Sequence, residues 1–348
     1  MPIVALLLSA AFAAALVPSV TQFAHSRGLY DTINDRKVHN GKIPRLGGVG
    51  IAVAFLIPYF VLLPLQGPLY DDPNDPIKIP PILLSGGIMF ILGLMDDLFD
   101  LRAMYKFLVQ IGAALLLMAF GFRFRVIMVP WGDGLFHLGY FSYTITLLWI
   151  IGITNAVNLI DGLDGLAGGI SFIAASTFGI FFWAKGLVLP AEICLAISGA
   201  VLGFLIFNLP PAKVFMGDSG SLFLGFSLAM LPLLGQRDTG AEIGLISAAT
   251  TLSIPILDTL MAMYRRKAAG KPFFSADKNH FHHVLLDKVK STTKAIAIVY
   301  GINIILALAA LSTLYAGAAL SFVLKITALL GLASTFVALK VHRMKAEK

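Results

Sequence analysis

Cysteine and charged residues are both scarce in this 348-residue sequence. The single cysteine, Cys194, excludes an internal disulfide and a cysteine-based metal site. Charged residues make up 13% of the chain and hydrophobic residues 58%, whereas roughly a quarter of the residues of a soluble domain are charged. With a mean hydropathy of +0.86, a soluble globule is excluded. No Lys or Arg precedes the first apolar run, so we expect that run to be a retained membrane span rather than a signal peptide.

Uncharged apolar runs recur along the whole chain, and many have the length of roughly 20 residues that a helix needs to cross a bilayer. The sequence therefore predicts an all-α, polytopic integral membrane protein with about eleven transmembrane helices. The predicted spans lie near residues 1–20, 47–65, 80–95, 105–121, 142–157, 166–184, 189–207, 219–235, 241–263, 294–315 and 320–340.

The basic residues are distributed unevenly between the two sets of loops. The loops after the even-numbered spans contain only Lys78, Arg123, Arg125, Lys185 and Arg237, and the other loops and the C-terminal tail contain most of the rest. The positive-inside rule then places the N-terminus outside and the C-terminus in the cytoplasm. Polar clusters near residues 21–46, 96–105, 155–165, 208–219 and 264–293 all fall on the cytoplasmic side. We expect one domain, 1–348, with one composite site.

The segment 155–169 combines acids, amides and glycines without a basic residue. Asn158, Asp161 and Asp164 are each three residues apart, which places them near one face of a helix. Clustered oxygens beside glycines suit a hard cation, or a ligand that approaches the backbone closely. The alternative is a polar hinge between two membrane helices, with its acids in water. This density of acids at a membrane edge favours the first interpretation.

A second acidic cluster surrounds the adjacent pair Asp96-Asp97. Asp96 and Asp100 are four residues apart and share a helix face, whereas Asp97 is turned about 100° away. Acid-rich patterns of this kind occur in enzymes that handle magnesium-bound diphosphates. The alternative is a water-facing helix end neutralised by Arg102.

The segment 207–221 contains a Pro-Pro break and a glycine-rich turn into the next span. Asp218 lies close to a helix start, where it is either a cap or a metal carboxylate beside amides that bind phosphate. Phe215 could stack on a flat base, although a single Phe is more often part of the core.

Three histidines, His280, His282 and His283, occur within four positions of the loop after the ninth span. A zinc site lacks the usual spacings and cysteine partners, and imidazoles near basic residues suit a diphosphate or a sugar better. The basic residues of this loop are also expected to contact anionic lipids. In the first loop, Lys42 and Arg45 precede Gly47-Gly48, and Arg45 has the better geometry for phosphate.

The order of these motifs resembles that of the polyprenyl-phosphate N-acetylhexosamine-1-phosphate transferases. The matching elements are Pro44-Arg45-Leu46-Gly47-Gly48, Asp96-Asp97, 155–165, 208–221 and His280-Phe281-His282-His283, and five ordered motifs are far more specific than one. The resemblance implies a transmembrane transferase that moves a sugar-1-phosphate from a UDP-sugar to a lipid phosphate at the cytoplasmic surface. Phe281 interrupts the three consecutive histidines of the muramoyl-pentapeptide branch. The chain is therefore more similar to the branch that transfers N-acetylglucosamine-1-phosphate to undecaprenyl phosphate.

The resemblance implies partners and roles for individual residues. The expected partners are UDP-N-acetylglucosamine, undecaprenyl phosphate and membrane lipids, with no nucleic acid, and a homodimer is allowed for. The expected location is the bacterial cytoplasmic (inner) membrane, and the expected cofactor is Mg²⁺, with Mn²⁺ as a substitute. The implied metal ligands are Asp218 and Asn158; the catalytic group comprises Asp96, Asp97, Asp161, His280, His282 and His283; and the substrate-binding group comprises Lys42, Arg45, Asn158, Asp164, Asn208, Phe215, Arg265 and Arg266.

Two chemical routes stay open from the sequence. The lipid phosphate is mostly dianionic at pH 7, so alignment and charge neutralisation are expected to supply most of the rate in a direct attack. Asp96 could then take a residual proton or orient Lys106. The rival is a two-step route through an aspartyl intermediate on Asp96 or Asp97.

Two other functions are compatible with the sequence. One is the muramoyl-pentapeptide transferase, against which the split histidines argue. The other is a secondary transporter, which would place its acids near the bilayer midplane and have repeated halves; here the acids cluster at span ends and no repeat is apparent. Competition between donors would test the first, and solute uptake without UMP release the second.

Overall fold

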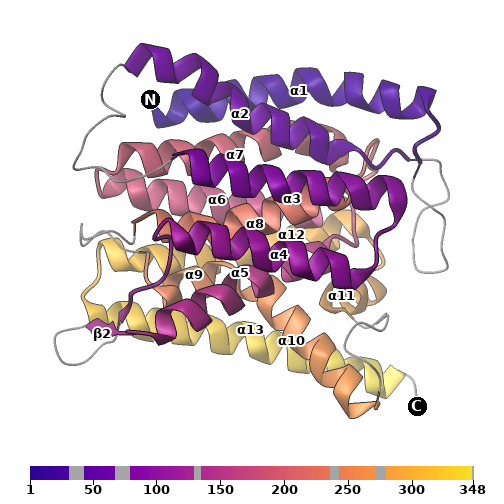
Figure 1. Ribbon diagram of the computed structural model, residues 1–348. Helices are drawn as coiled ribbons and strands as arrows, with labels where there is room; N and C mark the ends of the chain where they lie inside the picture. Colours follow the sequence, from indigo (N-terminus) through magenta and orange to yellow (C-terminus); the bar gives the residue numbers. More distant parts are fainter. Residues whose placement is uncertain (31–42, 67–78, 129–134, 236–242, 271–279, 347–348) are drawn as a thin grey trace.

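The computed structural model describes residues 1–30, 43–66, 79–128, 135–235, 243–270 and 280–346. Helices dominate these residues (Figure 1). In chain order they are α1 Pro2–Ser26, α2 Gly47–Gln66, α3 Ile79–Phe99, α4 Ala103–Ala119, α5 Phe141–Ile160, α6 Leu166–Ala184, α7 Val188–Asn208, α8 Gly217–Met230, η2 Leu231–Gly235, α9 Leu245–Thr251, α10 Ser253–Ala268, α11 Phe281–Val289, α12 Thr292–Leu311, η3 Ser312–Leu314 and α13 Ala318–Ala346. The two short strands are β1 Val126–Met128 and β2 Leu135–His137.

The predicted all-α, polytopic membrane fold is confirmed. Within the described residues, 8 helices are long and apolar enough to cross a membrane, and the bent pair α9 and α10 brings the number to 9. The two shorter apolar helices, in α2 and α4, coincide with two further predicted spans. Every apolar stretch predicted from the sequence thus falls on a helix or a helix pair. The number of spans and the orientation of the bundle stay predictions.

Three local features differ from the sequence-based expectation. The loop after α4 contains an antiparallel hairpin, in which Val126 pairs with His137. The loop after the ninth span contains the helix α11. The ninth span itself is broken by an 81° bend between α9 and α10. Pro255 lies in the first turn of α10, where its missing N–H is tolerated, but a continuous helix through this point would lack that hydrogen bond.

Helix α8 lies at the centre of the bundle, behind α3 in the view of Figure 1. Of the stretch Gly217–Gly235, 89% is buried, compared with 17% of Ala318–Ala338 in α13. Helices α2, α3 and α5 surround α8, and glycines allow the close approach. A side chain on Gly93 of α3 would overlap the carbonyl group of Asp218, and one on Gly48 of α2 would overlap the backbone of Gly220. The start of α8 is therefore held against two neighbouring helices at backbone distance.

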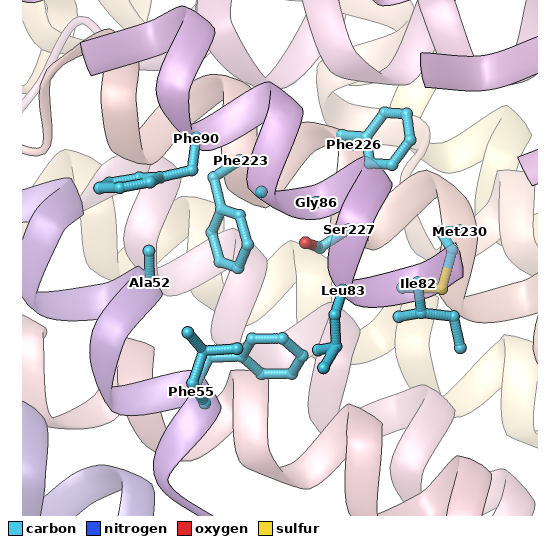
Figure 2. A pocket seen from close by; sticks show the side chains of 12 residues that line it. Ala52, Phe55, Ile82, Leu83, Gly86, Phe90, Phe223, Phe226, Ser227 and Met230 are labelled. Atoms are coloured by element: carbon cyan, nitrogen blue, oxygen red, sulfur yellow. The ribbon is translucent and has the colours of Figure 1, made fainter. Parts of the chain in front are cut away.

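Further along the same helices, an apolar cavity of about 70 Å³ opens between α2, α3 and α8. Figure 2 shows aromatic rings around it, Phe55 from α2, Phe90 from α3, and Phe223 and Phe226 from α8. The hydroxyl of Ser227 is the oxygen in this view. The helices α3 and α8 thus meet at backbone distance beside their acidic residues, whereas side chains and a small cavity lie between them near Gly86.

The contact between α3 and α8 can be tested with two alanine substitutions on one helix. In Gly93→Ala the new methyl group would overlap the Asp218 carbonyl, whereas at Gly87 it would meet nothing within 4 Å. We expect Gly93→Ala to lower the stability of the folded protein by about 1–3 kcal/mol. Gly87→Ala should leave stability unchanged or raise it slightly, because alanine favours a helix. Thermal unfolding in detergent measures both variants, and equal stabilities would contradict the close packing.

Candidate functional site

A cavity of about 480 Å³ lies where the polar clusters of the sequence meet. It has the size of small-molecule sites in proteins. Its walls come from the loop before α2, the end of α3, the turn between α5 and α6, the start of α8 and the start of α11. The lining residues are Arg45, Asp96, Asp97, Asp100, Asn158, Leu159, Asp161, Gly162, Leu163, Asp164, Asn208, Phe215, Gly217, Asp218, His280, His282 and His283.

The carboxylate of Asp97 caps the start of α8. Its Oδ1 accepts a hydrogen bond of 2.9 Å from the backbone N–H of Asp218, and its Oδ2 accepts one of 2.9 Å from that of Ser219. The first N–H groups of a helix have no partner within the helix, and they carry its positive dipole end. Gly217 allows this approach with φ +71°, and a side chain there would lie 2.6 Å from Asp97 Oδ2. Asp97 is 6% exposed, so its charge is stabilised mainly by α8.

The first loop is tied to the segment before α8 by backbone hydrogen bonds. The N–H of Phe215 donates to Pro44 (2.8 Å), and the N–H groups of Gly47 and Gly48 donate to Phe215 (2.9 Å) and Met216 (2.8 Å). Arg45 donates from Nη2 to the carbonyl oxygen of Asp97. These bonds place Arg45 and Phe215 on the cavity wall, beside the capped helix.

Asp96 and Asp218 both contact the ammonium group of Lys106, and Asn158 donates a hydrogen bond to Asp218. Lys106 Nζ lies 2.6 Å from Asp96 Oδ2 and 3.4 Å from Asp218 Oδ2. Asn158 Nδ2 donates to Asp218 Oδ1 at 2.9 Å and to Ser221 Oγ at 2.8 Å. The second oxygen of Asp96 accepts the N–H of Leu101 at 2.8 Å. Four helices, α3, α4, α5 and α8, thus bring two carboxylates, an amide and a cation to one point.

Asp164 and Asn208 hold the loops that surround the cavity. Asp164 Oδ2 accepts the N–H of Ala212 at 2.9 Å. Asn208 accepts the N–H of Gly165 at 2.9 Å through Oδ1 and donates from Nδ2 to the carbonyl of Val214 at 2.9 Å. Both side chains are buried. They were predicted to contact the substrate; they do line the cavity, and their hydrogen bonds also fix the turn between α5 and α6 against the segment after α7.

The three histidines lie together across the cavity, at the start of α11. The rings of His280 and His282 are stacked, with centroids 5.5 Å apart, and His282 and His283 are 4.4 Å apart. His280 Nδ1 lies 3.0 Å from Asp258 Oδ2. Burial, followed by the charges of His282 and His280, lowers the pKa of His283 to about 4. His283 is therefore neutral at pH 7 and can contribute a hydrogen bond rather than a positive charge.

Most of the predicted site residues converge, and two of those that the structure describes do not line the cavity. Arg265 and Arg266 lie at the end of α10 and are not among the described residues that line it. Lys42 falls outside the described residues. Two contributors were not among the predicted site residues: Lys106, expected only as a partner of Asp96, also reaches Asp218, and Asp258 contacts the histidines. An acid within an apolar span was the available signal for Asp258.

The oxygen-rich wall fits a magnesium ion. No group of three or more His, Cys, Asp or Glu side chains in the described part of the chain forms a complete metal site. Mg²⁺ does not require one, because it commonly takes one or two carboxylates and completes its shell with substrate phosphates and water. Asp218 and Asn158, with Asp96 nearby, supply such a partial set of oxygens. Lys106 already places a positive charge between Asp96 and Asp218.

The comparisons with known proteins agree with this picture of a membrane transferase. Residues 79–236, which run from α3 to the segment after η2, match glycosyl transferase family 4. A probable undecaprenyl-phosphate N-acetylglucosaminyl 1-phosphate transferase of Bacillus subtilis is 36% identical over 89% of this chain and 84% of the relative. The chain therefore belongs to glycosyl transferase family 4.

Two further relatives are named for transfer to a decaprenyl phosphate and to an undecaprenyl phosphate. The decaprenyl-phosphate N-acetylglucosaminephosphotransferase of Mycolicibacterium smegmatis is 35% identical, over 81% of this chain and 74% of the relative. The undecaprenyl-phosphate alpha-N-acetylglucosaminyl 1-phosphate transferase of Escherichia coli K12 is 30% identical, over 74% of this chain and 69% of the relative. The N-acetylglucosamine group recurs in all three names, which agrees with the branch expected from the split histidines.

The capping role of Asp97 predicts that it matters for stability, in contrast to Asp161. In Asp97→Asn, one of the two acceptors becomes a donor that faces a backbone N–H, and the charge opposite the helix dipole is lost. We expect a loss of about 1–3 kcal/mol in the free energy of unfolding. Asp161→Asn, at a half-buried position of the same cavity, should change stability by much less. Thermal unfolding measures both variants. If Asp97→Asn proved more stable than Asp161→Asn, the capping role of Asp97 would be contradicted.

Proposed function

We propose that the protein transfers N-acetylglucosamine-1-phosphate from UDP-N-acetylglucosamine to undecaprenyl phosphate and releases UMP. The observation that carries the proposal is the convergence of Asp96, Asp218 and Asn158 on one cavity that three histidines also line, with Lys106 bound to both acids. Family membership and the N-acetylglucosamine in the names of the relatives support the same reaction. The positive-inside rule supports an active site at the cytoplasmic face of a bacterial inner membrane.

The reaction depends on Mg²⁺ in this proposal, with Mn²⁺ as a substitute. Asp218 and Asn158 would hold the ion, with Asp96 adjacent, and the bound ion would neutralise charge on the donor diphosphate. Arg45, on the cavity wall, has the planar fork that suits a phosphate group. Phe215 presents a ring at the same wall for the uracil base.

The hydrogen bonds of the acidic pair favour direct transfer over the two-step route. Both oxygens of Asp97 accept backbone N–H groups, so a nucleophilic attack by Asp97 would release the start of α8. Both oxygens of Asp96 are also engaged, one by Leu101 and one by Lys106. An oxygen of the lipid phosphate therefore attacks the β-phosphorus itself, and the bond to the UMP oxygen breaks. Asp96 holds Lys106 beside the reacting phosphates.

Phe281, which separates the histidines, acts at a distance from the donor. Its ring stacks on Phe336 of α13, with centroids 4.1 Å apart and an angle of 10° between the planes. Phe281 is also absent from the described lining of the cavity. Phe281, which distinguishes this branch from the muramoyl-pentapeptide branch, thus anchors α11 to α13. The choice of sugar must then come from residues that line the cavity.

The proposal is tested by measuring UMP release from UDP-N-acetylglucosamine, with undecaprenyl phosphate and Mg²⁺, by the purified protein. Asp218→Ala should abolish turnover, a loss of roughly 100-fold or more, without unfolding the bundle. Asp287→Ala is the matched control, because Asp287 is an exposed acid of α11 that does not line the cavity. Near-normal turnover by Asp218→Ala would refute the metal assignment. Preference for the UDP-muramoyl-pentapeptide, or solute uptake without UMP, would refute the function.

A second experiment distinguishes the two chemical routes. Without a lipid acceptor, a direct transfer cannot exchange labelled UMP into UDP-N-acetylglucosamine, because no enzyme-bound sugar-phosphate forms. Without undecaprenyl phosphate we expect no exchange of labelled UMP above background. With the lipid present, the reverse reaction should carry labelled UMP into UDP-N-acetylglucosamine. Exchange without the lipid would establish the aspartyl intermediate and overturn the direct route.

A further inference from the structure

Asp258 lies inside the apolar helix α10 and is 2% exposed. Its carboxylate is directed at the start of α11. Oδ1 accepts the backbone N–H of Phe281 at 2.8 Å, and Oδ2 lies 3.0 Å from His280 Nδ1 and 3.7 Å from His282 Nδ1. One buried carboxylate therefore contacts the backbone and two of the three histidines of the motif.

This arrangement determines which ring nitrogen carries a proton. A carboxylate accepts hydrogen bonds only, so Nδ1 of His280 is the nitrogen that holds the proton, and Nε2 remains for other partners. Carboxylates behind functional imidazoles fix the tautomer and the ring orientation in this way at other sites. The His280 and His282 planes are only 14° apart, so a ring that is fixed at His280 limits the rotation of its neighbour.

His282 is held from the opposite side as well. Its side chain is 2% exposed, and a methyl group on Gly162 would lie 2.7 Å from its Nε2. Among the described residues, neither ring nitrogen of His282 has a hydrogen-bond partner. The imidazole therefore occupies a space bounded by Asp258 and Gly162, with hydrogen-bonding capacity left for a ligand.

We propose that Asp258 is a positioning residue of the transfer reaction, which sets the tautomer and orientation of His280 and, through the stacked rings, the orientation of His282. The inference rests on the proposed function, because it assigns the histidines to the donor sugar-diphosphate. Asp258 itself is absent from the described cavity lining, so it acts through the histidines and not on the substrate.

Asp258→Asn separates this role from simple capping of α11. The asparagine Oδ1 can still accept the N–H of Phe281, so the start of α11 keeps its cap. The Nδ2 group can only donate, which favours the opposite tautomer of His280, with its proton on Nε2. We expect an unchanged thermal unfolding temperature and a fall in kcat/KM for UDP-N-acetylglucosamine of roughly tenfold to hundredfold. Thr251→Val is the matched control, because it removes a buried hydrogen bond to Ser247 in the same broken span.

A double-mutant cycle with His280→Ala tests whether Asp258 acts through that histidine. If it does, Asp258→Asn should cost little further activity once His280 is absent, roughly twofold or less, because coupled residues are not additive. Losses that multiply fully in the double variant would overturn the proposal. The proposal would also be overturned if Asp258→Asn lost activity only in proportion to its loss of folded protein, and Thr251→Val lost as much.

The tautomer can be read directly, whatever the variant does to folding. In ¹⁵N spectra of the wild-type protein labelled at histidine, assigned with the His280→Ala variant, His280 should carry its proton on Nδ1. A proton on Nε2 would overturn the proposal. This measurement needs no turnover, so it stays decisive if wild-type protein fails to release UMP, a result that would instead refute the proposed function.

Discussion

The hydrogen bonds from the start of α8 to Asp97 are the constraint on which the catalytic end of the bundle depends. A buried carboxylate is costly unless its charge is compensated, and the first N–H groups of a buried helix are costly unless they are accepted. Each group satisfies the other, so α3 and α8 can meet at one register only. That register fixes Asp218 beside Asp96 and Lys106. The glycines at 93 and 217 are the steric counterpart of the same contact.

The same device occurs a second time in the molecule. Asp258 of α10 accepts the N–H of Phe281 at the start of α11, as Asp97 of α3 does for α8. In both cases a carboxylate from one helix receives the N-terminus of another, and the functional side chains adjoin the capped residues. Asp97 itself lines the cavity, whereas Asp258 lies behind the histidines that line it. In both places a buried carboxylate and a helix dipole together set the position of the functional groups.

Much of the fold could be predicted from the sequence, because membrane spans depend on local hydropathy. The apolar stretches, the grouping of the acids and the histidine motif are all features of short segments. Their partners are not: Asp97 and Asp218 are separated by 121 positions, and Asn158 and Asp218 by 60. Helical periodicity did indicate that Asp96 and Asp97 face different directions, but nothing local says that one faces Lys106 and the other α8. The bend before Pro255 and the hairpin of three-residue strands were missed because their signals are shorter than a span.

The acidic lining of the cavity bears on the role of the magnesium ion proposed above. Among the described residues, six carboxylates line it (Asp96, Asp97, Asp100, Asp161, Asp164 and Asp218), against one arginine. Lys106 and the start of α8 compensate part of that charge, and the neutral His283 adds none. A diphosphate carries negative charge, and like charges within a few ångströms repel strongly where water is excluded. Without a cation, this lining would therefore oppose the binding of the proposed diphosphate donor. A divalent cation at Asp218 would offset part of the remaining negative charge and bind the diphosphate directly, so in the proposed function nucleotide binding would depend on the metal.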